Sequence, residues 1–477
     1  MKKVMIIFIA IFLYADPPWS TNIKVSQDPG TGNQNETTMG VFGGNLVCGG
    51  WNDSRQTTYH VGFARSTNGG VSFLLDTLMI EPTYPADCDP CIAISDSGHI
   101  YYFWLSYNVS NYTGDIYFSK STDWGQSWGP MNCVTPGTPN TLDDKPWAII
   151  DGNNIFLSWY DYGGTGALRF KRSTNLGQTW MSPVTIGTGG NGTMCIRGTD
   201  SMLYVGWGYQ DLRFNRSTNM GTTWLGQTTI ITCPWSPVST PYRLNNIPCF
   251  KSNNARNVLY VVFADSRFGS GQVDVFFSKS TNQGVTWSTP VKINDTPSGD
   301  TTLQFYPFMA IDPNDNIHVV WYDTRGGSRY YVALYYSYST DQGATWAPNQ
   351  RVTDNRYYTS TFIGDYLACA VDANHVYALW CDCRNGSTNP DVYFSRTVNP
   401  VGIEENKTTA PPYRRLTLEI PNPFTKNAKI KYSPENAVLN IYQIDGRKIN
   451  FPDVPGIYFV ILQDKNEILC KKLIMIR

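Results

Sequence analysis

Six copies of one eight-residue phrase restrict the fold of this 477-residue chain more than any other feature of its sequence. Each copy starts with Ser-Thr, has Asp or Asn third and Gly fifth, and closes on Trp or Phe. An alternating strand such as Asp115–Lys120 precedes each copy and a short strand follows it, so we interpret the phrase as a hairpin turn. Its Ser and Asp or Asn bond to nearby backbone, its Gly accepts a positive φ, and its aromatic ring packs on a sheet. The copies span Ser66–Phe73, Ser121–Trp128, Ser173–Trp180, Ser217–Trp224, Ser280–Trp287 and Ser339–Trp346.

A second repeat lies upstream of the phrases and is an apolar strand that ends in Trp or Phe. Its seven marker residues are Trp51, Trp104, Trp159, Trp207, Phe263, Trp321 and Trp380. The seventh unit stops at Asn399-Pro400 without a phrase or an outer strand, whereas residues 21–28 resemble the outer strand at 289–295. We therefore predict that residues 21–400 form a seven-bladed, all-β propeller, in which the N-terminal strand completes the last blade and removes a sheet edge.

The phrase resembles the Asp box, S-x-D-x-G-x-T-W, also called the BNR repeat, of secreted β-propellers in the sialidase-like superfamily. Four copies have Asn in place of Asp, which keeps the acceptor oxygen. The resemblance implies a fold rather than an activity because Asp boxes are structural. Sialidases have six blades, so a six-bladed propeller is the alternative. The structural box residues are Asn68, Asp123, Asn175, Asn219, Asn282 and Asp341.

Composition agrees with an all-β, multidomain chain. Charged residues make up 16% and aromatic residues 14% of the sequence, which favours sheets. A net charge of −1 predicts no nucleic-acid partner. Of the eleven cysteines, the close pairs Cys88/Cys91 and Cys381/Cys383 lack a second pair at zinc-finger spacing. We interpret them as buried thiols or local disulfides, and we predict no cofactor.

The two ends of the chain indicate export. Lys2 and Lys3 precede an apolar run from Val4 to Tyr14, which is typical of a signal peptide and about half the length of a membrane-spanning helix. We assign residues 1–15 to this signal, with no transmembrane segment after its removal. Residues 401–417 read as a linker with two prolines.

Residues 418–477 resemble the C-terminal sorting domain of the type IX secretion system. The resemblance rests on an ordered series of motifs: Pro421-Asn422-Pro423-Phe424, Asp445-Gly446-Arg447 and Gly456-Ile457-Tyr458-Phe459-Val460. It implies a small β-sandwich, recognition by the type IX machinery, and a secreted or surface-attached protein that is exported through the periplasm. A generic carbohydrate-binding sandwich is the alternative.

Candidate binding residues lie on the propeller face opposite the Asp boxes. Four Asp-x-Arg segments and one further Asp follow the marker aromatics, and other polar residues lie in the loops that lead into the blades. The candidates are Asp53, Arg55, Asp161, Asp265, Arg267, Asp323, Arg325, Asp382, Arg384, Tyr306, Asp365 and Tyr366, with Asp87, Asp89, Asp143 and Asp144 near them. Local Asp–Arg pairing is the favoured interpretation, a glycan or carboxylate site is the other, and the Asp-rich mouth leaves a Ca²⁺ ion open.

The resemblance to sialidases also implies a catalytic Tyr, and the Tyr hydroxyl needs a neighbouring Glu to attack at neutral pH. The chain has no Glu between Glu81 and Glu404, and it lacks the family's early Arg-Ile-Pro motif; only Tyr242-Arg243-Leu244 comes near. The sequence therefore favours a non-catalytic propeller that binds a glycan or a surface protein. The alternative is a glycoside hydrolase, either exo-sialidase-like or using two aspartates, as in seven-bladed Asp-box xyloglucanases.

Overall fold

The computed structural model describes residues 18–401, apart from Pro29, Thr31, Thr57, 138–140, 164–165, Tyr209, Pro237 and Ser298, together with six short strands between 417 and 475. The predicted signal peptide, residues 1–15, and most of the predicted linker lie outside this range. Two compact units, residues 1–403 and 404–477, are described separately. The regular secondary structure of the described residues consists of β-strands. No helix among these residues is long and apolar enough to cross a membrane.

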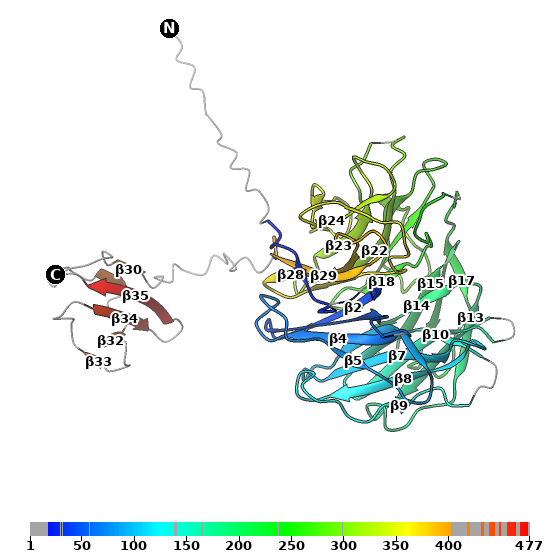
Figure 1. The fold of residues 1–477 in the computed structure, drawn as a ribbon, viewed down its shortest axis with the longest axis horizontal. Helices are drawn as coiled ribbons and strands as arrows, with labels where there is room; N and C mark the ends of the chain where they lie inside the picture. The colour runs from blue at the N-terminus through cyan, green and yellow to red at the C-terminus, as the bar shows by residue number, and fades with distance from the viewer. Residues whose placement is uncertain are drawn as a thin grey trace, which may run out of the picture. The chain divides into compact units, whose positions relative to one another are not determined.

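Seven antiparallel sheets of four main strands form the first unit, and they are the blades of a seven-bladed β-propeller (Figure 1). This confirms the fold class predicted from the repeats. Blades 1 to 3 are β2 (Gln34–Phe42), β3 (Leu46–Asp53), β4 (His60–Ser66), β5 (Thr77–Met79); β6 (Ala86–Ile94), β7 (Ile100–Asn108), β8 (Thr113–Ser121), β9 (Asn132–Cys133); and β10 (Asp143–Asp151), β11 (Asn154–Asp161), β12 (Ala167–Ser173), β13 (Val184–Thr188).

The remaining blades follow the same order of strands. Blades 4 to 6 are β14 (Asn191–Arg197), β15 (Leu203–Gly208), β16 (Leu212–Ser217), β17 (Thr228–Ile231); β18 (Cys249–Ser252), β19 (Leu259–Asp265), β20 (Asp274–Ser280), β21 (Val291–Lys292); and β22 (Gln304–Ile311), β23 (Ile317–Asp323), β24 (Tyr331–Ser339), β25 (Gln350–Arg351), with β26 (Tyr357–Tyr358) added beside β24. Blade 7 consists of β27 (Ala368–Val371), β28 (His375–Asp382), β29 (Asp391–Val398) and β1 (Ile23–Lys24).

The N-terminal strand β1 closes the ring, as the sequence predicts. Ile23 pairs with Phe394 and Lys24 with Tyr393, and Val25 N donates to the carbonyl of Val392 at 2.8 Å. Because the outer strand of blade 7 comes from the opposite end of the propeller sequence, the ring has no free terminal blade.

The Asp boxes form the turns between the third and fourth strands of blades 1 to 6. In the copy after β20, Ser280 Oγ and Thr286 N donate to Asn282 Oδ1 at 2.9 and 3.0 Å, and Gly284 N donates to Ser280 Oγ at 2.9 Å. Gly284 has a φ of 78°, a conformation that strains other residues. The other five copies form the same bonds.

Asn and Asp are interchangeable at the box because the neighbouring hydroxyl reverses its role. Asn282 Nδ2 donates to Thr286 Oγ1 at 2.8 Å, whereas Thr345 Oγ1 donates to Asp341 Oδ2 at 2.6 Å. A hydroxyl both donates and accepts, so either residue at the third position is satisfied.

The closing ring of each box packs on an aromatic residue of the preceding blade. The ring of Trp287 meets that of Phe214 at 5.6 Å and 76°, and a Cβ added to Gly284 would lie 2.3 Å from the same Phe214 ring. The box thus holds the ring of the neighbouring blade between its Gly and its Trp. The six contacts are Phe73–Phe394, Trp128–Phe63, Trp180–Phe118, Trp224–Phe170, Trp287–Phe214 and Trp346–Phe277.

Blade 7 has no box, and Trp19 takes the place of the missing closing ring. Trp19 lies four residues before β1, as Trp287 lies four residues before β21. Its ring meets that of Tyr336 at 5.3 Å and 78°, and Tyr336 occupies the position in β24 that Phe277 occupies in β20. The sequence analysis assigned residues 21–28 to the last blade but gave Trp19 no role.

The second unit contains two small antiparallel sheets. One pairs β30 (Thr417–Glu419) with β31 (Lys431–Ser433). The other has the order β33-β32-β34-β35 and consists of β33 (Lys448–Ile449), β32 (Val438–Gln443), β34 (Gly456–Gln463) and β35 (Ile468–Met475).

We expect Trp19→Ala to lower the free energy of unfolding of the propeller by about 2 kcal/mol, because a partly buried indole and its aromatic contact are lost at the closing seam. Trp287→Ala should cause a loss of similar size. Trp124→Ala, at an exposed box position, is the matched control and should change stability by less than about 0.5 kcal/mol. Urea unfolding of the three variants measures these differences, and equal stability of Trp19→Ala and wild type would contradict the assignment.

Candidate functional site

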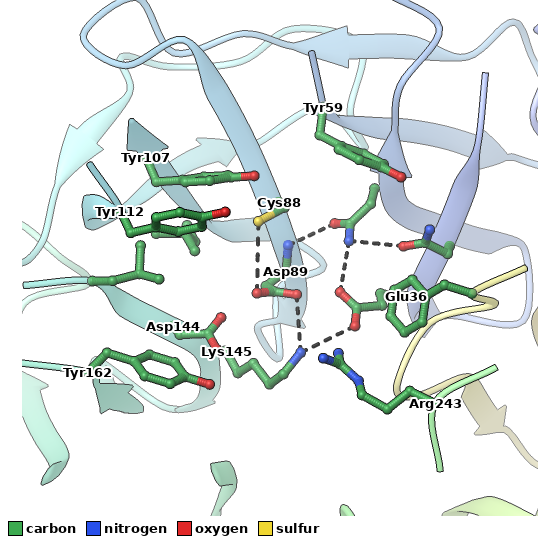
Figure 2. Close-up of a pocket in the computed structure, with 15 residues that line it drawn as sticks. Glu36, Tyr59, Cys88, Asp89, Tyr107, Tyr112, Asp144, Lys145, Tyr162 and Arg243 are labelled. Atoms are coloured by element: carbon green, nitrogen blue, oxygen red, sulfur yellow. Dashed lines mark hydrogen bonds and ion pairs between the residues drawn. The ribbon is translucent and has the colours of Figure 1, made fainter. Parts of the chain in front are cut away.

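A cavity of about 670 Å³ opens on the face opposite the Asp boxes, over blades 1 to 3. This face is formed by the starts of the first strands and the ends of the second strands, because successive strands run in opposite directions. Figure 2 shows Tyr107, Tyr112 and Tyr162 on one side of the view, Tyr59 on the other, and the charged groups of Asp89, Glu36 and Lys145 between them. The aromatic lining residues are Tyr59, Tyr107, Tyr112, Tyr162 and Phe362, and the polar ones are Asn35, Glu36, Asn52, Asp89, Asp144, Lys145 and Arg243.

A β-bulge at the same point of three successive first strands aims charged side chains at this cavity. The register of β2, β6 and β10 shifts at Glu36, Asp89 and Lys145, whose φ angles are 56°, 53° and 51°. A positive φ in such residues costs on the order of 1–3 kcal/mol and tends to persist at functional sites. The bulges of β14 and β22 carry Gly192 and Tyr306 instead, also at positive φ.

The ammonium group of Lys145 lies among three carboxylates. Its Nζ is 3.2 Å from Glu36 Oε1, 3.4 Å from Asp89 Oδ1 and 3.1 Å from Asp365 Oδ2. Asp365 also binds Arg243 through both of its oxygens, with Arg243 Nε 2.7 Å from Oδ1. Buried charges need such partners, because each one alone would lose its hydration without compensation.

Asn52 links Glu36 to Asp89 and fixes their relative positions. Its Nδ2 donates to Glu36 Oε2 at 2.8 Å, and its Oδ1 accepts from Asp89 N at 2.7 Å. The amide of Asp365 donates to Glu36 Oε1 at 3.2 Å. Glu36 is therefore fixed by bonds to both oxygens.

Burial raises the pKa of both carboxyls. It is the main cause that raises the pKa of Glu36 to about 7, and the charge of Asp89 adds to it. Burial also raises the pKa of Asp89 to about 6, although the charge of Lys145 opposes it. Both carboxyls thus hold a proton at higher pH than ordinary carboxyls do, and a raised pKa is what a carboxyl needs to act as a general acid.

Two tyrosines proposed from the sequence reach this cluster. Tyr306 Oη donates to the carbonyl oxygen of Arg243, and Tyr366 Oη donates to Asp89 Oδ1 at 3.5 Å. The ammonium of Lys145 lies 5.3 Å from the centre of the Tyr366 ring. Burial raises the pKa of both hydroxyls well above the ordinary value, so neither is a ready nucleophile at neutral pH.

Of the residues proposed from the sequence, the structure brings Asp89, Tyr306, Asp365 and Tyr366 to the cluster and places Asp144 in the cavity lining. It holds Asp161 and the Asp-x-Arg residues in local ion pairs. The four Asp-x-Arg segments bind within themselves, and Asp161 binds Arg169 at 3.0 Å. The paired residues are Asp53 with Arg55, Asp265 with Arg267, Asp323 with Arg325, and Asp382 with Arg384. In three of these segments the Asp also accepts the indole N–H of the marker Trp, as in Trp51 to Asp53 at 2.8 Å.

The sequence analysis missed Glu36 and Lys145, and its argument from a missing glutamate was wrong for this site. That argument covered the chain after Glu81, whereas Glu36 comes from blade 1 and lies near enough for its charge to raise the pKa of Tyr306 and Tyr366. Pro90, Pro146 and Pro307 follow three of the bulge residues, and a Pro inside a strand indicates a bulge. Glu36 is followed by Thr37 and carries no such signal.

The cluster does not fit a Ca²⁺ ion. Lys145 Nζ occupies the point at which the carboxylates converge, and a cation there would repel it. In the part of the chain that the structure describes, no group of three or more His, Cys, Asp or Glu side chains is arranged to hold a metal ion. Its ten cysteines, including those of both close pairs, are free thiols.

No protein-family model and no curated protein matches the chain. Similar solved structures include a Hadza microbial sialidase at 14% identity, with a TM-score of 0.45, covering 61% of this chain and 63% of the sialidase. An α-L-arabinanase of Penicillium chrysogenum complexed with arabinobiose is 12% identical, with a TM-score of 0.46 and coverages of 81% and 100%. A protein of unknown function from Dyadobacter fermentans is 10% identical, with a TM-score of 0.48 and coverages of 80% and 98%. At these identities and TM-scores the likenesses carry no argument about activity.

We expect the free energy of unfolding to fall as pH rises from about 4.5 to 7. The folded protein holds a proton on Glu36 that the unfolded chain has already released, so stability decreases with pH across this window. Glu36→Gln should remove on the order of 1–3 kcal/mol of this dependence. Denaturant unfolding at pH 5 and pH 7.5 measures it, with Asp96→Asn, an exposed carboxyl outside the cavity, as control. An unchanged slope in Glu36→Gln would contradict the raised pKa.

Proposed function

We propose that this propeller is a glycoside hydrolase that binds an uncharged glycan in the cavity and cleaves it with Glu36 and Asp89. The observation that carries the proposal is one buried carboxyl pair with raised pKa values, bonded to a common ammonium group in a cavity lined by aromatic rings. This proposal reverses the preference for a non-catalytic protein that the sequence favours.

The charge of the cavity supports a neutral substrate. The three carboxyls of the cluster and that of Asp144 in the cavity lining face two cations, and the more exposed cation, Arg243, is already paired with Asp365. An anionic sugar such as a sialoside would meet net negative charge and no unpaired arginine of the cluster. The tyrosine rings offer apolar faces to sugar C–H groups and hydroxyls to their oxygens.

The geometry suits a displacement in which Asp89 is the nucleophile. Oxygens 3.2 and 3.4 Å from one nitrogen can be no more than about 6.6 Å apart, so the pair is too close for most of the about 6.5–9.5 Å range of inverting glycosidases. Asp89 would bond to the anomeric carbon as the glycosidic C–O bond breaks, and Glu36 would give its proton to the leaving oxygen. Water would then release the sugar, with Glu36 as the base that recovers a proton.

A glycan-binding role without catalysis is the second candidate. Its support is the position of Lys145, whose ammonium bonds to both Glu36 and Asp89. One of these two bonds would have to break before the reaction. In that case the carboxyls would serve as hydrogen-bond acceptors for sugar hydroxyls.

We expect Glu36→Gln and Asp89→Asn each to lower hydrolysis of a neutral polysaccharide by about 10²–10⁴-fold. A panel of xylan, arabinan, galactan and β-1,4-glucan, assayed for reducing ends, measures this loss. Asp341→Asn is the matched control because four other boxes of the chain already have Asn there. A fluorogenic sialoside should not be turned over. Binding without turnover would favour the second candidate, and sialoside turnover that depends on Tyr306 would contradict the proposal.

The sequence motifs of the C-terminal tail support a second proposal, which concerns export of the protein. We propose that residues 418–477 direct the chain to the cell surface through the type IX machinery, after a signal peptide has taken it to the periplasm. The separate sheets and separate compact unit of the tail are consistent with an independent module.

Deletion of residues 418–477 should leave the thermal unfolding temperature of the propeller within about 2 °C of the full chain, because the two units have separate sheets. The truncated protein should remain in the periplasm of its own host. Cell fractionation and calorimetry test the two statements. Surface delivery of the truncated chain would contradict a sorting role.

A further inference from the structure

A second cavity, of about 500 Å³, lies beside the first and shares Tyr162 with it. It is lined by Tyr160, Gln210, Asp211 and Arg213 from blades 3 and 4, and it contains none of the carboxyls of the proposed reaction. The ring of Tyr162 is 49% exposed and meets the Tyr160 ring edge-on at 4.4 Å and 88°. Tyr162 is therefore the common wall of two adjoining cavities.

The combined space is too large for a single sugar unit. Ligand pockets of about 300–1,000 Å³ hold a whole drug-sized molecule, and the first cavity alone lies within that range. We propose that the second cavity is a further sugar subsite, so that the substrate is an oligosaccharide or polysaccharide chain that crosses Tyr162. This inference rests on the proposed function, and it adds the class of substrate.

Arg213 supplies hydrogen-bond donors to the second subsite. It is half-buried in β16, donates from Nη1 to the carbonyl of Thr188 at 2.8 Å, and forms no ion pair with any carboxylate of the described residues. Its remaining N–H groups are donors for sugar hydroxyls. A Cβ at Gly189 would lie 2.2 Å from the Arg213 guanidinium, so the absence of a side chain at position 189 leaves room for the guanidinium.

The two tyrosine rings give the same subsite its apolar recognition. Tyr160 and Tyr162 pack perpendicular to each other, and Tyr162 is 49% exposed, so it offers apolar surface to the chain. A sugar ring stacked on Tyr162 has neighbours in both cavities, and this arrangement favours a continuous chain over two separate small ligands.

Calorimetric titration of the Glu36→Gln protein tests the inference without turnover. The probes are oligosaccharides of two to eight units prepared from xylan, arabinan, galactan and β-1,4-glucan. For at least one series, affinity should rise about tenfold or more from the disaccharide to the octasaccharide. Adding Arg213→Ala or Tyr162→Ala should weaken octasaccharide binding by about fivefold or more, and Arg213→Ala should weaken it more than disaccharide binding.

Arg216→Ala is the matched control, since Arg216 lies on the same strand but contributes to the box face. It should bind every probe as the Glu36→Gln protein does. Equal affinity for short and long chains, or an equal loss for both in Arg213→Ala, would overturn the second subsite and leave the first cavity as proposed. Length-dependent binding with no turnover by the wild type would support the subsite and contradict hydrolysis. No binding of any probe would overturn both.

Discussion

The propeller depends on aromatic rings held between neighbouring blades. In six blades the ring comes from the third strand, and the Gly and the closing aromatic of the next Asp box enclose it. Each contact buries large apolar surfaces and adds about 0.5–1.5 kcal/mol from ring geometry. Because the contact joins two blades, it sets the angle between them, and repetition of that angle brings the seventh blade back to the first.

The same regularity creates the site. Equivalent bulges occur in the first strands of blades 1, 2, 3, 4 and 6, and the residue type at the bulge decides which group each of these blades contributes to the site. Glu36, Asp89 and Lys145 occupy this position in blades 1, 2 and 3, while Gly192 leaves it open in blade 4. The backbones of these blades are thus similar, whereas the charges at the bulge position differ from blade to blade. The charged bulge residues belong to blades 1 to 3, and the cavity lies over these blades.

The Asp-x-Arg carboxylates and the cavity carboxyls lie on the same face of the propeller but are held in different ways. The Asp-x-Arg segments follow the marker residues, and in three of them the carboxylate binds both the indole N–H and the guanidinium, so that it is saturated by its own segment. In the cavity, by contrast, Glu36 and Asp89 share one ammonium group, and burial raises their pKa values. The shared ammonium does not offset the cost of burying both charges, so both carboxyls bind a proton more readily than a carboxyl at the surface does.

The sequence by itself determined the repeating architecture: seven blades, the turn in which each box lies, and the N-terminal strand that closes the ring. These features follow from patterns a few residues long, which act through backbone hydrogen bonds and alternation. It also placed Tyr306, Asp365 and Tyr366 on the functional face. Only the tertiary structure decided that Trp19 packs on Tyr336, and that Glu36, Asp89, Lys145 and Asp365 meet. The physical reason is that these groups lie on different blades, so their contacts and pKa values exist only once the ring has closed.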